Sequence, residues 1–165
     1  MFIARNATAE SYSLLITILV LISPLSLMAD AERPIQWREG FVTVDVDLRE
    51  VEGHEGHAVG LMQQRGFAFY DNGDVATVNV WLTFERSGGE TNYRGYAIYT
   101  YMDGTTKTGR FIGTGDPRGE QSGYFTLEGG SGRYEGITGK GTFTGRAFPP
   151  QGDIYLDVRG TYSIQ

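Results

Sequence analysis

The sequence contains no cysteine, and this absence removes both disulfide bonds and thiol catalysis from consideration. Helix signals are also nearly absent, since no ten-residue stretch beyond residue 31 combines helical apolar spacing with a cap. The 14 lysine and arginine residues are outnumbered by 20 acidic residues and form no cluster. An acidic chain without a basic cluster is poorly suited to bind nucleic acid, so we expect no nucleic-acid partner.

The longest apolar run lies near the start of the chain. LLITILVLISPLSLM (14–28) precedes Ala29 and Ala31, small residues at the positions that a signal peptidase reads. The run is short for a membrane span and is interrupted by proline. We therefore expect residues 1–31 to be a cleaved signal peptide, the protein to be secreted or periplasmic, and the mature chain to have no membrane span. An uncleaved N-terminal anchor is the alternative, because Glu10 is atypical before such a core.

Strand signals fill residues 32–165, which we expect to form one domain. Eight segments rich in strand-forming residues are separated by turn dipeptides such as Asn72-Gly73 and Asp103-Gly104. The segments are 42–48, 57–70, 74–85, 91–102, 106–115, 122–128, 139–148 and 154–164. Strands with short links favour an antiparallel meander, and closing the meander into a barrel leaves no free edge. The expected fold class is therefore all-β, an eight-stranded antiparallel β-barrel.

Alternation within 74–85 assigns its side chains to two faces. Val78 and Val80 share one face, whereas Asn79 and Trp81 share the other. A packed barrel would turn the valines inward, but a ligand-holding barrel could place the mixed face inside and bury the valines against a partner subunit. The alternation leaves this choice open.

The segment EGGSGRYEGITGKGTFTG (128–145) is very rich in glycine. Its spacing does not match a phosphate-binding loop, because the first glycine and the final hydroxyl residue of that motif are both missing. The aromatic and aliphatic residues spaced through it argue against a flexible linker. Gly139, Gly141 and Gly145 share one face of a strand with Phe143. We expect the missing side chains to let the strand coil tightly and to let large neighbours lean across it.

Part of this segment, GGSGRYEGITGKG (129–141), resembles the glycine-rich segment of plant allene oxide cyclases, and plant dirigent proteins carry a related one. The strand YAIYTYMDG (96–104) is similar to an aromatic strand of the cyclases. The likeness covers roughly 90–165 well and 41–90 only in pattern. It implies an eight-stranded barrel, usually a homo-oligomer such as a dimer or trimer, that steers a reactive small molecule without a cofactor.

Asp45 and Asp47 lie two residues apart in the first predicted strand. The resemblance places Asp45 where the cyclases have a catalytic glutamate, and Asp47 where they have an asparagine. Two carboxylates in a dry pocket would repel, so one would hold a proton. The alternative is that both lie on a solvated outer face. The arginine that follows the dirigent glycine segment is missing here, which favours cyclase-like or binding activity over radical coupling.

Further candidates are aromatic or lie in a loop. Tyr99 and Tyr101 share a face and are candidates for the wall of a ligand pocket, with a packed interior as the alternative. Asn79 and Trp81 are candidates for the opposite wall or for an oligomer surface. His57 belongs to the loop segment GHEGH, whose spacing is not that of a zinc site, so we expect no metal and consider it a rim residue or a plain loop residue.

These patterns predict an exported β-barrel that binds a small apolar or aromatic ligand. The resemblance adds cofactor-free cyclase or isomerase chemistry, in which the pocket folds the substrate and a carboxylate stabilises developing positive charge. The alternative is a non-catalytic carrier or surface protein that uses the same barrel, because one fold hosts many functions.

Overall fold

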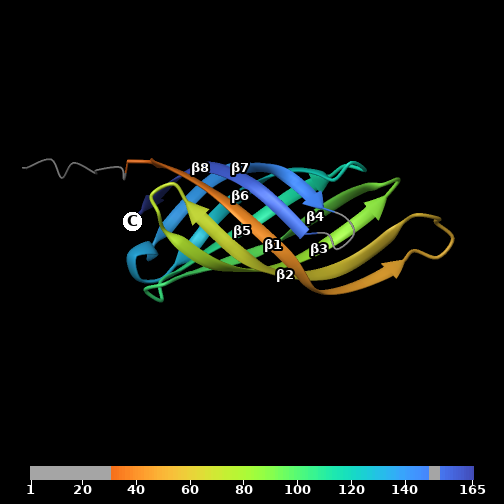
Figure 1. Ribbon diagram of the computed structural model, residues 1–165, viewed down its shortest axis with the longest axis horizontal. Coiled ribbons are helices and arrows are strands. Elements are labelled where there is room, and N and C mark those ends of the chain that lie inside the picture. The colour runs from red at the N-terminus through yellow and green to blue at the C-terminus, as the bar shows by residue number, and fades with distance from the viewer. Residues whose placement is uncertain (1–30, 149–152) are drawn as a thin grey trace, which may run out of the picture.

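The computed structural model describes residues 31–148 and 153–165, which form a closed barrel of eight antiparallel strands (Figure 1). Strands pair in chain order, and the first pairs with the last. They are β1 (Arg33–Glu50), β2 (Ala58–Tyr70), β3 (Val75–Ser87), β4 (Glu90–Tyr101), β5 (Thr106–Gly115), β6 (Glu120–Gly130), β7 (Ile137–Phe148) and β8 (Asp153–Ile164), with a 3-10 turn, η1 (Gly132–Tyr134), after β6. The predicted all-β, eight-stranded barrel is confirmed.

Two sequence predictions concern export and membrane insertion. All but the last residue of the predicted signal peptide, 1–31, lies outside the described residues. Within the described part of the chain, no helix has the length and apolar character needed to cross a bilayer.

The structure settles which face of β3 lines the lumen. Val78 and Val80 are buried inside the barrel, whereas the Trp81 side chain points outward and is 43% exposed. Alternation along an antiparallel strand with one solvated face accounts for this pattern. The valine face is therefore the inner one, and the mixed face is the outer one.

The glycines of β7 allow an aromatic ring to lie against the barrel wall. Gly141 is directly opposite Gly160 of β8. A Cβ atom on Gly141 would stand 2.6 Å from the ring of Phe125, and one on Gly160 would stand 2.9 Å from it. The ring of Phe125 therefore occupies space that side chains would fill, as the one-sided glycine pattern predicted.

β1 extends beyond the part of the barrel in which it pairs with both of its neighbours. Its first part, Arg33–Phe41, pairs with β8, while the pairing with β2 continues to Glu50. Among the described residues, the distal part of β1 therefore pairs with a strand on one side only, and the β1–β2 hairpin projects beyond the ring (Figure 1). A bulge between Thr43 and Asp45 interrupts the register in this region, and it reverses which residues face inward.

Candidate functional site

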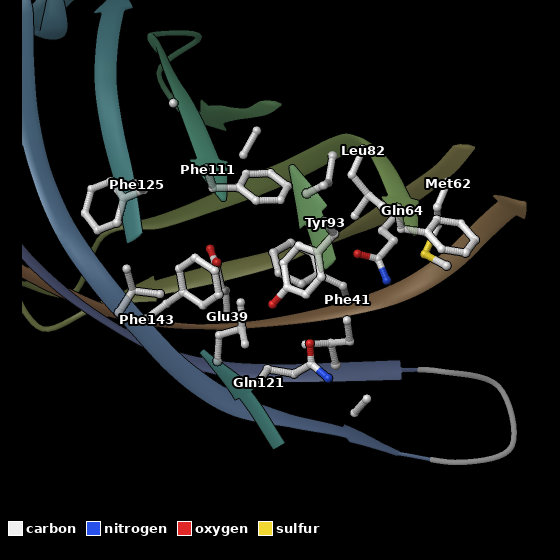
Figure 2. Close-up of a pocket in the computed structure, with 18 of the residues that line it drawn as sticks. Glu39, Phe41, Met62, Gln64, Leu82, Tyr93, Phe111, Gln121, Phe125 and Phe143 are labelled. Atoms are coloured by element: carbon white, nitrogen blue, oxygen red, sulfur yellow. The ribbon is translucent and has the colours of Figure 1, made fainter. Parts of the chain in front are cut away.

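A cavity of about 440 Å³ occupies the barrel lumen toward the end where the hairpin projects (Figure 2). Its volume lies in the range of small-molecule sites. Apolar and aromatic side chains form most of its wall, among them Phe41, Leu82, Tyr93, Phe111, Phe125 and Phe143. The polar side chains Glu39, Gln64 and Gln121 also line it. A mostly apolar cavity with few polar groups suits a small ligand of largely apolar surface.

Glu39 is a buried carboxyl group at the deep part of this cavity. Only 6% of its surface is exposed, and its Oε2 atom accepts two hydrogen bonds. Trp37 Nε1 donates one over 2.8 Å, and the Tyr99 hydroxyl donates the other over 3.2 Å. Burial raises the pKa of Glu39 to about 7, although both hydrogen bonds and the charge of Lys107 act in the opposite direction.

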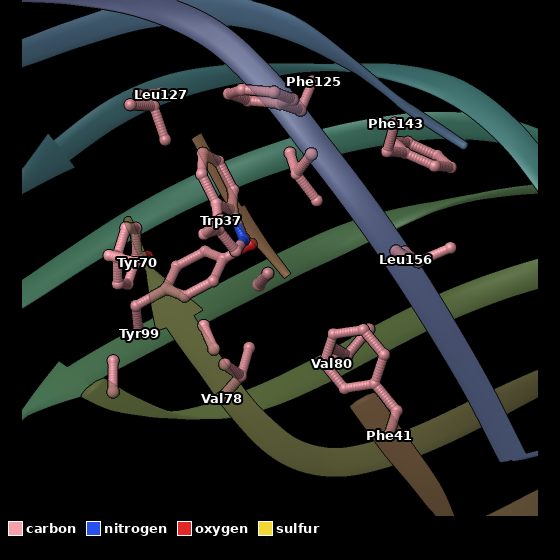
Figure 3. Packing of buried hydrophobic residues seen from close by; sticks show 14 of the residues in the cluster. Trp37, Phe41, Tyr70, Val78, Val80, Tyr99, Phe125, Leu127, Phe143 and Leu156 are labelled. Atoms are coloured by element: carbon pink, nitrogen blue, oxygen red, sulfur yellow. The ribbon is translucent and has the colours of Figure 1, made fainter. Parts of the chain in front are cut away.

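Lys107 is fully buried behind the same aromatic side chains. Its Nζ donates a 2.8 Å hydrogen bond to the Tyr70 hydroxyl. It also lies 4.5–4.8 Å from the ring centroids of Trp37, Tyr70 and Tyr99, three side chains that Figure 3 shows close together. Such ring faces attract an ammonium group and partly replace its lost hydration. Even so, burial lowers the pKa of Lys107 to about 7, and the charge of Glu39 only partly opposes this shift.

The lumen is closed at the end where Lys107 lies. Tyr101 and Tyr134 lie with ring centroids 4.9 Å apart, and the Arg133 guanidinium lies over both rings. Arg133 is itself bound by Asp74 at 2.9 Å and by Asp103 at 3.6 Å. This layer separates Lys107 from solvent, so the cavity is reached from the opposite end.

Asp45 and Asp47, the candidate catalytic carboxylates, take the alternative position on the outer face and not the lumen position that the resemblance implied. Both side chains are exposed and point away from the cavity. The physical reason is the bulge: Thr43 lines the cavity before it, and Val46 lines the cavity after it. Without the bulge, the aspartates would share the inner face with Glu39. The buried carboxylate of β1 is thus Glu39.

The other predicted site residues fall into separate places. Tyr99 lines the cavity and contacts Glu39, while Tyr101 is buried beside Tyr134, outside the cavity lining. Trp81 and Asn79 face outward, where Asn79 accepts a hydrogen bond from Arg65. This orientation removes both from the lumen wall.

His57 lies at the end of the loop before β2, and its Nε2 is 2.7 Å from Glu85 Oε1. It contacts β3 rather than the cavity. Within the described residues, no group of three or more His, Cys, Asp or Glu side chains could hold a metal ion.

Sequence reasoning missed Glu39 and Lys107, although a signal for each was present. Trp37, Glu39 and Phe41 alternate with Arg38 and Gly40, which would have extended the first strand toward the N-terminus. Lys107 has the parity of the inward glycines of β5. In both cases the signal is a charged residue with the parity of the inner face, and its use requires knowing which face of the strand is the inner one.

Comparisons with known proteins do not identify a function for the chain. No family model and no curated protein matches the chain. Among solved structures, the pterocarpan synthase dirigent protein GePTS1 is similar, with 11% sequence identity, a TM-score of 0.48, and coverage of 84% of this chain and 88% of that one. The assignment of the barrel rests on the closed ring of strands, and a function has to be argued from the cavity.

Proposed function

We propose that this protein binds a small, largely apolar ligand in the lumen of its barrel. The observation that carries the proposal is the cavity of about 440 Å³, walled by aromatic and aliphatic side chains and reaching a buried carboxyl group. The closed layer around Arg133 gives the cavity a floor, so a ligand would enter past the β1–β2 hairpin. Binding without chemistry, as in a carrier, needs nothing more than these features.

Cofactor-free isomerase or cyclase activity is a second candidate, and one observation favours it. A buried carboxyl group with a pKa of about 7 can give up or accept a proton near neutral pH, and Glu39 is such a group in the cavity. In this second proposal Glu39, rather than Asp45, is the acid or base. Tyr99 would orient it through their hydrogen bond.

We also propose that the protein is exported and that it associates with further copies of itself. The apolar run 14–28 supports passage across a membrane with removal of the leader. Exposed apolar side chains on the outer wall, such as Phe67 and Phe69, whose rings lie 6.4 Å apart, support contact with another copy.

A titration with prodan, a small neutral fluorophore whose emission shifts to the blue in apolar surroundings, tests lumen binding. We expect saturable binding of about one prodan per chain, accompanied by a rise of the melting temperature. A linear, unsaturable signal with an unchanged melting temperature would contradict the proposal.

A further inference from the structure

The lumen already holds one ammonium group against aromatic rings. Lys107 Nζ lies within 6 Å of five ring centroids and, within the described residues, has a single hydrogen-bond partner, the Tyr70 hydroxyl. Two of these rings belong to Trp37 and Tyr99, whose N–H and O–H groups bind Glu39 on the cavity side. The same aromatic layer therefore faces a cation on one side and a carboxylate on the other.

The carboxylate of Glu39 keeps one oxygen free for a ligand. Both described hydrogen bonds end on Oε2, and Oε1 accepts none from the described residues. Among these residues, Tyr101 Oη is the single fully buried side-chain N or O atom without a partner, so the unpaired Oε1 must keep contact with open space. Because Glu39 lines the cavity and is otherwise buried, that space is the cavity.

No cation of the described chain faces Glu39 from the cavity side. Two arginines border the cavity. Arg110 is bound on the outer wall by Glu128 and stacks on Tyr96, and Arg86 is exposed near the end of β3, at the mouth. Lys107 forms no ion pair with Glu39, because its Nζ lies more than 4.0 Å from both carboxylate oxygens. A buried carboxylate without a contacting counter-charge is costly, and a ligand cation would offset that cost.

We propose that the ligand is a small organic ammonium ion with an aromatic or apolar body, and that its ammonium group binds Oε1 of Glu39. This inference rests on the proposed lumen binding and specifies its ligand class. The rings of Phe41, Phe125 and Tyr99, which line the cavity with Glu39, provide aromatic surface for the ammonium group and its body. Gln64, also in the lining, offers an amide oxygen as a further acceptor.

Three ligands that share one ring system and differ in one group test this proposal. They are 2-naphthylmethylamine, 2-naphthylmethanol and 2-naphthoate, measured by calorimetry on the full chain at about pH 8, above the pKa of about 7 of Glu39. We expect the amine to bind at least about tenfold more tightly than the alcohol, and the carboxylate to bind most weakly, because Glu39 repels it.

Glu39→Gln supplies the matched control, since it keeps the shape and removes the charge. In this variant we expect the amine to lose about tenfold in affinity while the alcohol changes by less than about threefold. Equal affinities of amine and alcohol in the wild-type chain would overturn the proposal, as would an amine preference that survives in the variant. Tightest binding of the carboxylate would also overturn it and would point to Arg86 at the mouth. In each of these cases prodan would still bind, whereas a failure of lumen binding itself would abolish prodan binding as well.

Discussion

Glu39 and Lys107 are both buried in one barrel lumen and are bridged by Trp37 and Tyr99 rather than by an ion pair. The ring faces of the two aromatic residues meet the ammonium group at 4.6 and 4.8 Å, while their N–H and O–H groups donate to the carboxylate. This arrangement matches the quadrupole of an aromatic ring, whose face is negative and whose edge is positive. Lys107 therefore lies at the closed end of the lumen, and the carboxylate of Glu39 faces the cavity.

The buried carboxyl group predicts a pH-dependent stability. Its pKa in the folded state, about 7, lies above its ordinary value of 4.5, so the unfolded chain loses this proton at a lower pH than the folded chain. The stability that the carboxyl group contributes is therefore fully present below pH 4.5 and is lost as pH rises through 7. The wild-type free energy of unfolding should therefore fall relative to that of Glu39→Gln across this window, by about 3 kcal/mol. Urea unfolding at several pH values measures the difference. The exposed Glu90 supplies a control, and Glu90→Gln should follow the wild type throughout. A constant difference between wild type and Glu39→Gln would contradict the shifted pKa.

Replacement of the buried lysine predicts the opposite window. The pKa of Lys107 is lowered from 10.5 to about 7, so the unfolded chain takes up this proton at a higher pH than the folded chain. The stability that the neutral amine contributes is therefore fully present above pH 10.5 and is lost as pH falls through 7. Relative to Lys107→Met, the wild-type free energy of unfolding should decrease as pH falls through this range. Chemical unfolding between about pH 7 and 10 measures it. A wild-type chain that instead gains stability on acidification would show that the aromatic rings and Glu39 stabilise the charged form more than burial disfavours it.

The glycine that faces Phe125 predicts a strong packing effect. A Cβ on Gly141 would stand 2.1 Å from the Arg159 carbonyl oxygen as well as close to the ring, so Gly141→Ala should lower the free energy of unfolding by about 2 kcal/mol or more. Gly129 is the matched control, because a Cβ there meets nothing within 4 Å. Thermal unfolding of both variants separates the two cases, and equal melting temperatures would contradict the packing described for Phe125.

The aspartates of β1 provide a negative prediction. Asp45→Asn and Asp47→Asn should each leave the free energy of unfolding within about 0.5 kcal/mol of wild type, because both side chains are exposed. Prodan affinity should also be unchanged. A tenfold loss of affinity in a folded variant would return these carboxylates to the binding site.

Sequence patterns were sufficient for the fold but not for the site. Alternation and turn dipeptides located all eight strands, because one inner face and short links dominate such a barrel. They also placed Tyr99 among the candidates that line the cavity. The lumen position that the resemblance implied for Asp45 is not found, and the alternative outer position is, because one bulge changes parity. Nothing in the residues around Val44 signals a bulge.

The partnership of Glu39 with Lys107 was out of reach for a different reason. The two residues are 68 positions apart, from 39 to 107, and come near each other only because the strands close into a barrel. Their local sequences show a strand with a charged residue, which is equally typical of a solvated face. Whether that residue is inside depends on the register of neighbouring strands, a long-range property.

Blocking the mouth of the cavity distinguishes a ligand in the lumen from a ligand on the outer wall. Val46 lines the cavity and is 48% exposed, whereas Val42 is 54% exposed and lies outside the cavity lining on the same strand. Val46→Trp should fill the entrance and weaken prodan binding by at least about tenfold, while Val42→Trp should leave the dissociation constant within about twofold of wild type. Equal prodan affinity in both variants, with both chains folded, would place the ligand on the outer wall and contradict binding in the lumen.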